Sequence, residues 1–203
     1  MKRQLLPGAI AGILIASGVA AIPAAQADGT PELRLTVDAN ITAGTCSVAV
    51  LEGESPTNTI AFGNVYISEV FAKAKVKPFK LRFSNCTGLM DKKATVTLAP
   101  RGENIGCAGS TTQNAEFSNA SSSTAKAQKT GVEVWTTETP EGSGSVQFHC
   151  YNKNAQTVDL SGASATTPVD YPLSARMVPV GTDISKLTAG DFYSPTVFTV
   201  TYQ

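Results

Sequence analysis

The residues with the clearest chemistry are four cysteines and a single histidine. The cysteines are Cys46, Cys86, Cys107 and Cys150, and His149 directly precedes the last of them. No two cysteines form a C-x-x-C pair, so the chain lacks the ligand spacing of a zinc site, and we expect no bound metal. In an exported protein an even number of cysteines predicts disulfide bonds, and four cysteines allow three pairings. We expect the sequential pairing, Cys46 with Cys86 and Cys107 with Cys150.

Catalytic chemistry has little support in the sequence. His149 and Cys150 are adjacent, and neighbouring side chains of a strand point to opposite faces, so the two could not share a proton. There is no Gly-x-Ser-x-Gly motif and no phosphate-binding glycine loop. Carboxylates such as Glu133 and Glu138 could form a glycosidase pair only if folding brought them together. We therefore expect neither enzymatic activity nor a cofactor.

The N-terminus predicts export. Lys2 and Arg3 are followed by an uncharged stretch whose core, residues 8–22, is apolar, and Pro23 ends it. Residues 25–27 read Ala-Gln-Ala, the small-x-small pattern of a signal-peptidase site. A membrane anchor is the weaker interpretation, because a span needs about 20 firmly apolar residues. We expect residues 1–27 to be a cleaved signal peptide, so that mass spectrometry of the exported protein starts at Asp28.

The remaining residues, 28–203, are enough for one domain. The leader holds two of the 16 basic residues and none of the 16 acidic ones, which leaves a net charge of −2. A weakly acidic protein has no electrostatic reason to bind nucleic acid or anionic lipid. No later apolar run approaches the length of a membrane span, so we expect no stable membrane insertion.

Apolar and polar residues alternate with the period of a half-buried β-strand through most of this chain. Turn-forming residues separate the alternating segments, and a brief helical turn is possible in residues 67–74. Strands of this length and spacing predict an all-β sandwich of two antiparallel sheets. The expected strands are residues 33–41, 79–83, 94–98, 131–135, 146–150 and 196–202.

Residues 101–130 depart from this pattern, because they are rich in Ser, Thr, Gly, Asn and Gln. They carry few side chains suited to a core, so we expect an exposed loop, tethered through Cys107. A ligand-binding role for this loop is the alternative.

A row of basic residues precedes and enters the strand at residues 79–83. It comprises Lys73, Lys75, Lys77, Lys80 and Arg82. The row could bind nucleic acid or glycan, but a solvated strand face that discourages edge-to-edge aggregation is the commoner explanation.

Five motifs, in order, resemble the pilins of the type 1 and P fimbria class, which a chaperone and an usher assemble. The resemblance covers nearly all of the exported chain, and Gly190 is the fourteenth residue from the C-terminus, as in that family. The motifs are Gly-Thr-Cys at 44–46, Ile-Ala-Phe-Gly at 60–63, an alternating strand ending in Asn-Cys at 79–86, the strands at 131–134 and 171–177, and the end at 198–203.

The resemblance implies an incomplete immunoglobulin-like sandwich of six strands, whose missing seventh strand is supplied by another protein. Residues 28–45 would then be an N-terminal extension that is donated to a neighbour, and residues 46–203 the pilin domain. The donated side chains would be Leu33, Leu35, Val37, Ala39 and Ile41. The receiving groove would be bordered by Gly190, Phe198, Val200 and Tyr202.

The implied partners are a periplasmic chaperone, an outer-membrane usher and neighbouring subunits, and the implied location is the periplasm and then a cell-surface fimbria. Three features depart from the family pattern: Ala39 where a glycine is frequent, the second cysteine pair and the 101–130 segment. We therefore expect a minor or adaptor subunit that supports adhesion. The alternative is a secreted carbohydrate-binding sandwich, an adhesin or lectin.

Overall fold

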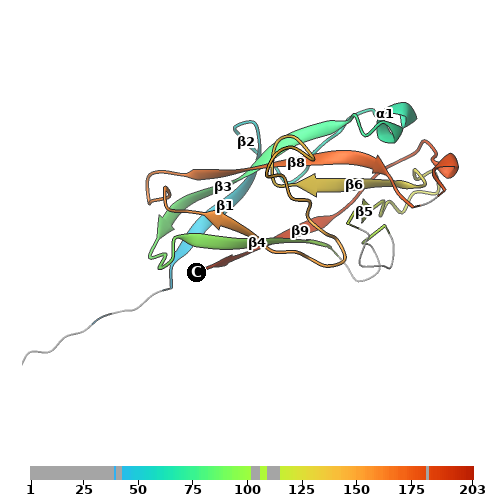
Figure 1. Cartoon of the computed structure of the whole chain (residues 1–203). Helices are drawn as coiled ribbons and strands as arrows, with labels where there is room; N and C mark the ends of the chain where they lie inside the picture. The colour runs from blue at the N-terminus through green and yellow to red at the C-terminus, as the bar shows by residue number, and fades with distance from the viewer. Residues whose placement is uncertain (1–38, 40–42, 102–105, 109–114, 182) are drawn as a thin grey trace, which may run out of the picture. The chain divides into compact units, whose positions relative to one another are not determined.

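Two antiparallel sheets form the domain, and a computed structural model describes residue 39 and residues 43–101, 106–108, 115–181 and 183–203. The larger sheet has the strand order β2–β1–β3–β8–β6–β5, and the smaller has the order β7–β4–β9 (Figure 1). The strands of the larger sheet are β1 (Thr45–Glu52), β2 (Ser55–Pro56), β3 (Val76–Thr87), β5 (Phe117–Ser118), β6 (Thr130–Trp135) and β8 (Val169–Pro179). Those of the smaller sheet are β4 (Lys93–Pro100), β7 (Gln156–Asp159) and β9 (Thr196–Tyr202).

Period-2 alternation places one face of each central strand in the core between the sheets. In β3 the side chains of Phe79, Leu81 and Phe83 are buried, and in β4 Val96 and Leu98 are buried, with polar residues between them. The predicted all-β sandwich is thereby confirmed. Four of the expected strands, residues 79–83, 94–98, 131–135 and 196–202, lie within β3, β4, β6 and β9, and β1 and β8 complete the long strands among the described residues. The short strands β2, β5 and β7 have four residues or fewer.

One helical turn, α1 (Ile67–Phe71), occurs where the sequence allowed it. It begins after Tyr66, whose backbone N–H donates to the Glu69 carboxylate at 2.8 Å. A 3₁₀ turn, η1 (Ile184–Lys186), precedes the last strand. Neither helix in the described part of the chain has the length and apolarity that crossing a membrane requires.

The strand expected at residues 146–150 is wrong. It pairs with β6 at a single bridge, between Trp135 and Gln147. Beyond that bridge the Asn154 side chain accepts a hydrogen bond from the backbone N–H of His149 at 2.6 Å, and the chain turns away from the sheet. A side-chain acceptor thus replaces the ladder that a strand would need. The inward alternation survives, because Phe148 and Cys150 are buried.

The 101–130 segment is not simply an exposed loop. Phe117 has no exposed surface, and Ala115, Ala127 and Thr130 are also buried among the described residues. The segment contains β5 and is joined by the Cys107–Cys150 disulfide, whose Cα atoms lie 5.5 Å apart. Despite its polar composition, the segment therefore contributes a buried aromatic residue, Phe117, to the core and is held by a disulfide.

The last three residues of the basic row, Lys77, Lys80 and Arg82, lie on a central strand rather than at an edge, because β3 pairs with β1 on one side and β8 on the other. Their charges are neutralised by carboxylates: Lys77 contacts Glu52, and Lys80 and Arg82 both contact Glu54 and Asp170. The Arg82 guanidinium is the main cause that lowers the pKa of Asp170 to about 2. The expected strand face is thus ion-paired, and because β3 is not an edge strand its charges do not act against edge-to-edge aggregation.

Candidate functional site

The last strand, β9, is an edge strand that has one neighbour in the described structure, β4. The core-facing side chains of β4, among them Val96 and Leu98, are at most 1% exposed. Those of β9, Phe198, Val200 and Tyr202, alternate with exposed residues but remain half-buried. Both strands alternate equally well, so the difference comes from position: no strand of the described chain pairs with the second side of β9. An apolar edge strand of this kind is a template for pairing with another chain.

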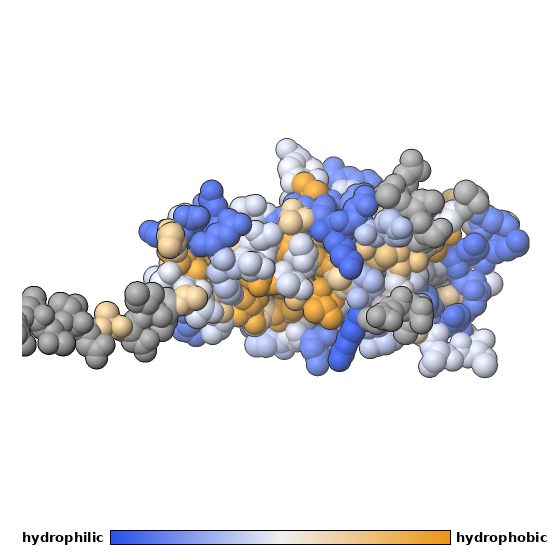
Figure 2. All heavy atoms as spheres, turned by 90° about the horizontal axis from the view of Figure 1, so that it is seen from below, coloured by the Kyte–Doolittle hydropathy of each residue, from blue (hydrophilic) through white to orange (hydrophobic). Residues whose placement is uncertain are grey.

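A groove of about 860 Å³ lies beside β9. One wall is formed by the segment leading into β9, which includes Gly190 and Tyr193, and by Phe198 of β9. The other is formed by residues 58–65 together with Val50. Its floor consists of core residues from both sheets: Phe79, Leu98, Val132, Val134, Ala175 and Met177. On the face shown in Figure 2, hydrophobic residues reach the surface in a lengthwise strip. The groove therefore reaches down to core side chains of both sheets beside an unpaired strand edge.

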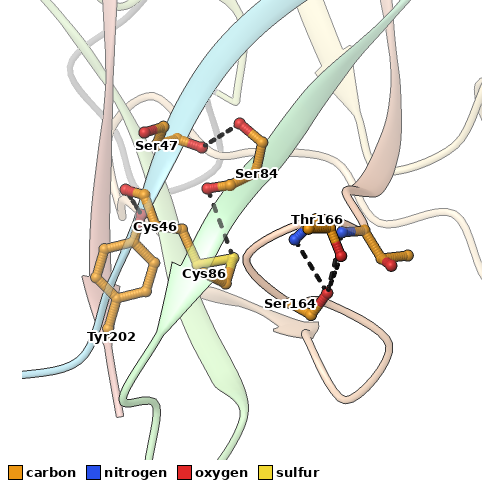
Figure 3. Close-up of a disulfide and its surroundings, with 8 residues drawn as sticks. Cys46, Ser47, Ser84, Cys86, Ser164, Thr166 and Tyr202 are labelled. Atoms are coloured by element: carbon orange, nitrogen blue, oxygen red, sulfur yellow. Dashed lines mark hydrogen bonds between the residues drawn. A yellow bond between two sulfur atoms is a disulfide. The ribbon is translucent and has the colours of Figure 1, made fainter.

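The C-terminal end of β9 is fastened to β1. The Tyr202 hydroxyl donates a hydrogen bond to the Cys46 carbonyl oxygen at 3.0 Å, next to the Cys46–Cys86 disulfide (Figure 3). Burial raises the pKa of the Tyr202 hydroxyl, which remains a donor at neutral pH. The Cα atoms of Cys46 and Cys86 lie 4.1 Å apart, so both expected disulfides are present. With Cys150 oxidised, the Cys–His pair considered from the sequence has no thiolate to use.

The structure brings part of the predicted groove edge together. Gly190 and Phe198 line the groove, whereas Val200 and Tyr202 lie further along β9 and pack against the core beyond it. Of the predicted donor residues, Leu33, Leu35, Val37 and Ile41 lie outside the described residues. Ala39 is described, is exposed and belongs to no strand.

One wall of the groove was misread from the sequence. Residues 60–63 resemble a short strand of the pilin family, but they have no ladder partner in the structure. Ile60 and Phe62 are half-buried and line the groove instead. Their period-2 spacing could have marked them as a core-facing wall, but the spacing alone does not distinguish a paired strand from an unpaired extended segment.

Gly190 is required at the rim by close backbone packing. A Cβ atom at this position would lie 2.1 Å from the carbonyl oxygen of Ala125, and φ is +149°, in a region that side chains disfavour. The neighbouring chain segments are joined by hydrogen bonds in both directions, Ala127 N–H to the Asp191 carbonyl at 2.9 Å and Asp191 N–H to the Ala125 carbonyl at 3.1 Å. The absence of a side chain at Gly190 thus allows this wall of the groove to pack directly against the backbone of residues 125–127.

Replacing Gly190 with Ala should lower the free energy of unfolding by about 1–3 kcal/mol, because the new methyl group meets backbone that cannot move alone. Urea unfolding of the domain with its groove filled would measure the loss. Gly53→Ala is the matched control, since Gly53 also has a positive φ of +61° but has no atom within 4 Å of a built Cβ. Equal losses in the two variants would contradict the packing explanation.

An antiparallel β-sandwich with a groove beside its last strand defines the class: an immunoglobulin-like domain with an open edge at β9. Solved structures of the same fold include the P pilus rod subunit PapA, with a TM-score of 0.50, 15% identity and coverage of 78% of this chain and 99% of that chain. A subunit from the structure of a chaperone–usher pilus also has a TM-score of 0.50, at 14% identity, and covers 86% of this chain and 98% of that chain.

Sequence comparison gives the family. A family model described as "Fimbrial protein" matches residues 33–203. A curated relative, the uncharacterized fimbrial-like protein YadL of Escherichia coli (strain K12), is 40% identical over 175 residues, which cover 85% of each chain. The chain therefore belongs to the fimbrial protein family, and the resemblance to chaperone–usher subunits is confirmed.

Proposed function

We propose that this fimbrial subunit polymerises by receiving a β-strand from a neighbour in the groove beside β9. The observation that carries the proposal is the contrast between β4 and β9: the core-facing residues of β4 are fully buried, and those of β9 are not. A strand inserted beside β9 would pair with its free edge and cover the groove floor. In such strand addition, main-chain hydrogen bonds supply affinity and alternate side chains supply specificity.

The chain also carries a candidate strand to donate. Leu33, Leu35, Val37, Ala39 and Ile41 form an apolar row in the family-matched leader. Burying four or five such side chains, at about 1.5–3 kcal/mol each, gives a gross gain on the order of 10 kcal/mol before ordering costs. Because one chain carries both a groove and a donor row, the leader of one subunit could fill the groove of the next, and subunits would join head to tail.

Strand direction explains why the donor should come from another molecule. The leader joins the domain at Thr45, beside Cys46 and the C-terminal end of β9. A leader that folded back into its own groove would run parallel to β9, whereas a strand from a neighbour can enter antiparallel. Antiparallel pairing is slightly more stable per residue, so the intermolecular arrangement is favoured.

The partners follow from the same surface. A periplasmic chaperone would protect the groove until an outer-membrane usher exchanges it for the leader of the next subunit, which places the mature subunit in a cell-surface fimbria. The second disulfide and the described part of the 101–130 segment, which contains β5, add to the basic sandwich, and we assign the chain a minor or adaptor rank on that ground. The role is structural and not catalytic.

The test is to fill the groove within one chain. A second copy of residues 32–43, fused after Gln203 through a short flexible linker, starts at the C-terminal end of β9 and can run antiparallel to it. We expect the exported chain alone to aggregate or polymerise and the fusion to be a cooperatively folded monomer, as measured by size-exclusion chromatography and urea unfolding. A stable monomer without any added strand would contradict the proposal.

A further inference from the structure

Two exposed apolar side chains lie at opposite ends of β9. Met90, in the turn between β3 and β4, is 90% exposed, and Tyr193, just before β9, is 61% exposed. Side chains of this size are normally tolerated singly at a surface, but a pair at the two ends of a head-to-tail unit can be complementary. We propose that Met90 of one copy of this chain docks against Tyr193 of the next copy. The inference rests on the proposed strand donation.

The Met90 turn lies where the donated leader leaves its own domain. Gly44, directly before β1, packs so closely on the turn that a Cβ atom there would be 2.3 Å from the Gly88 carbonyl oxygen. The same turn is held to the C-terminus, since the Asp91 N–H donates to the Gln203 carbonyl at 3.2 Å. Any neighbour that receives the leader must therefore approach this end of the domain.

Tyr193 lies where an antiparallel donor strand would end. β9 runs from Thr196 to Tyr202, so an antiparallel donor would enter beside Tyr202 and leave beside Thr196. Tyr193 lines the groove at this exit. Its backbone is fixed by Asn119 and Ala120: its N–H donates to the Asn119 side chain at 3.1 Å, and its carbonyl accepts from the Ala120 N–H at 2.6 Å. The ring is thus exposed on a fixed backbone.

The length of the connection brings the two ends together. Only residues 42–44 separate Ile41, the last donor residue, from Thr45, the first residue of β1. Four residue steps span at most about 14 Å, so the start of β1 in the donor's domain must lie within about that distance of the acceptor's groove exit. At that separation even a weak contact is populated, because the tether gives it a high effective concentration.

Charged residues of both signs lie around each of the two side chains. The Met90 turn carries Asp91, Lys92 and Lys93, all exposed. The groove lining near Tyr193 carries Arg101 and Asp191, also exposed. In the docked pair, the lysines of the Met90 turn can therefore face Asp191 of the next copy. Asp91 of the same turn can face Arg101 of that copy. Such pairs contribute little energy but set the register of a docked surface.

A thiol pair tests the contact in the full exported chain. Under mild oxidation a chain carrying Met90→Cys and Tyr193→Cys should give a ladder of covalent multimers. The matched control carries Met90→Cys and Tyr151→Cys, since Tyr151 is a comparably exposed aromatic residue, at 48%, outside the groove lining. We expect about tenfold more cross-linked dimer from the Tyr193 pair. Equal yields from polymers that form normally would overturn this contact and leave strand donation standing.

A photo-cross-linking amino acid at Tyr193 avoids added thiols, which could disturb the two native disulfides. Mass spectrometry should map its adducts to the Met90 turn of a second copy. Adducts confined to other surfaces of polymerised chains would overturn the proposal. If the chain forms no polymer and electron microscopy shows no fibres, strand donation itself fails, and this contact fails with it.

Discussion

Replacing Val37 with Asp should abolish strand donation. Val37 is the middle residue of the apolar row in the leader, so its side chain is expected to enter the groove of the neighbour. The groove floor is formed by residues such as Phe79, Val132 and Met177, which offer no partner for a charge. An unpaired buried carboxylate costs several kcal/mol, a large part of the net gain expected from the strand. A fusion that carries Val37→Asp in the added strand should aggregate as the unfused chain does.

Thr36→Asp is the matched control for this variant. It adds the same charge to the adjacent residue, whose side chain would point away from the groove because neighbouring residues of a strand face opposite sides. Size-exclusion chromatography should show a monomer for the Thr36 variant and aggregates for the Val37 variant. If the Val37 variant fills the groove as well as the native strand, the donor register proposed here is wrong.

The second large effect is expected at the buried ion pair between Arg176 of β8 and Glu133 of β6. Both residues are at most 6% exposed, and the Arg176 Nε donates to the Glu133 carboxylate at 2.9 Å. The guanidinium also contacts Glu141 at 2.7 Å and lies 5.4 Å from the centre of the Trp135 ring. The pair joins the two strands that supply much of the groove floor.

Arg176→Met should lower the free energy of unfolding by about 3–5 kcal/mol, because it leaves Glu133 buried without its main partner. Lys73, 3.6 Å from the same carboxylate, should limit the loss, since its partly exposed chain can move closer. Urea unfolding of the groove-filled monomer is the measurement. The double variant Arg176→Met with Glu133→Leu should recover most of the loss, because it removes the stranded charge as well. A double variant no more stable than Arg176→Met would show that the cost lies in packing and not in charge.

Properties set by local pattern could be predicted from the sequence. The alternation of Phe198, Val200 and Tyr202 identified β9 with its bounds, because the strand period is a property of consecutive residues. The sequential disulfides were also predicted correctly, since an exported chain with four cysteines and no metal spacing has few other uses for them. The fold class followed from many such segments in order.

Errors arose where a distant residue decided the outcome. The strand at residues 146–150 was lost to the hydrogen bond that the His149 backbone N–H donates to the Asn154 side chain, and nothing in the alternation of those residues reveals this competition. The basic row seemed exposed because its carboxylate partners come from elsewhere in the chain, Glu54 from the turn between β1 and β2 and Asp170 from β8. Phe117 was assigned to a loop because its neighbours are polar, yet its ring fills the core.

The sequence by itself determined that the chain is built from strands and disulfide-bonded, and it predicts export and an apolar leader ahead of the domain. Only the tertiary structure decided where that domain is open. The half-burial of Phe198 depends on which strands stand beside β9, and the rim depends on Gly190 meeting the backbone of Ala125. Strand character is a local property that a few residues encode. Whether a strand edge is left unpaired is a property of the whole packing, because it depends on where all the other strands lie.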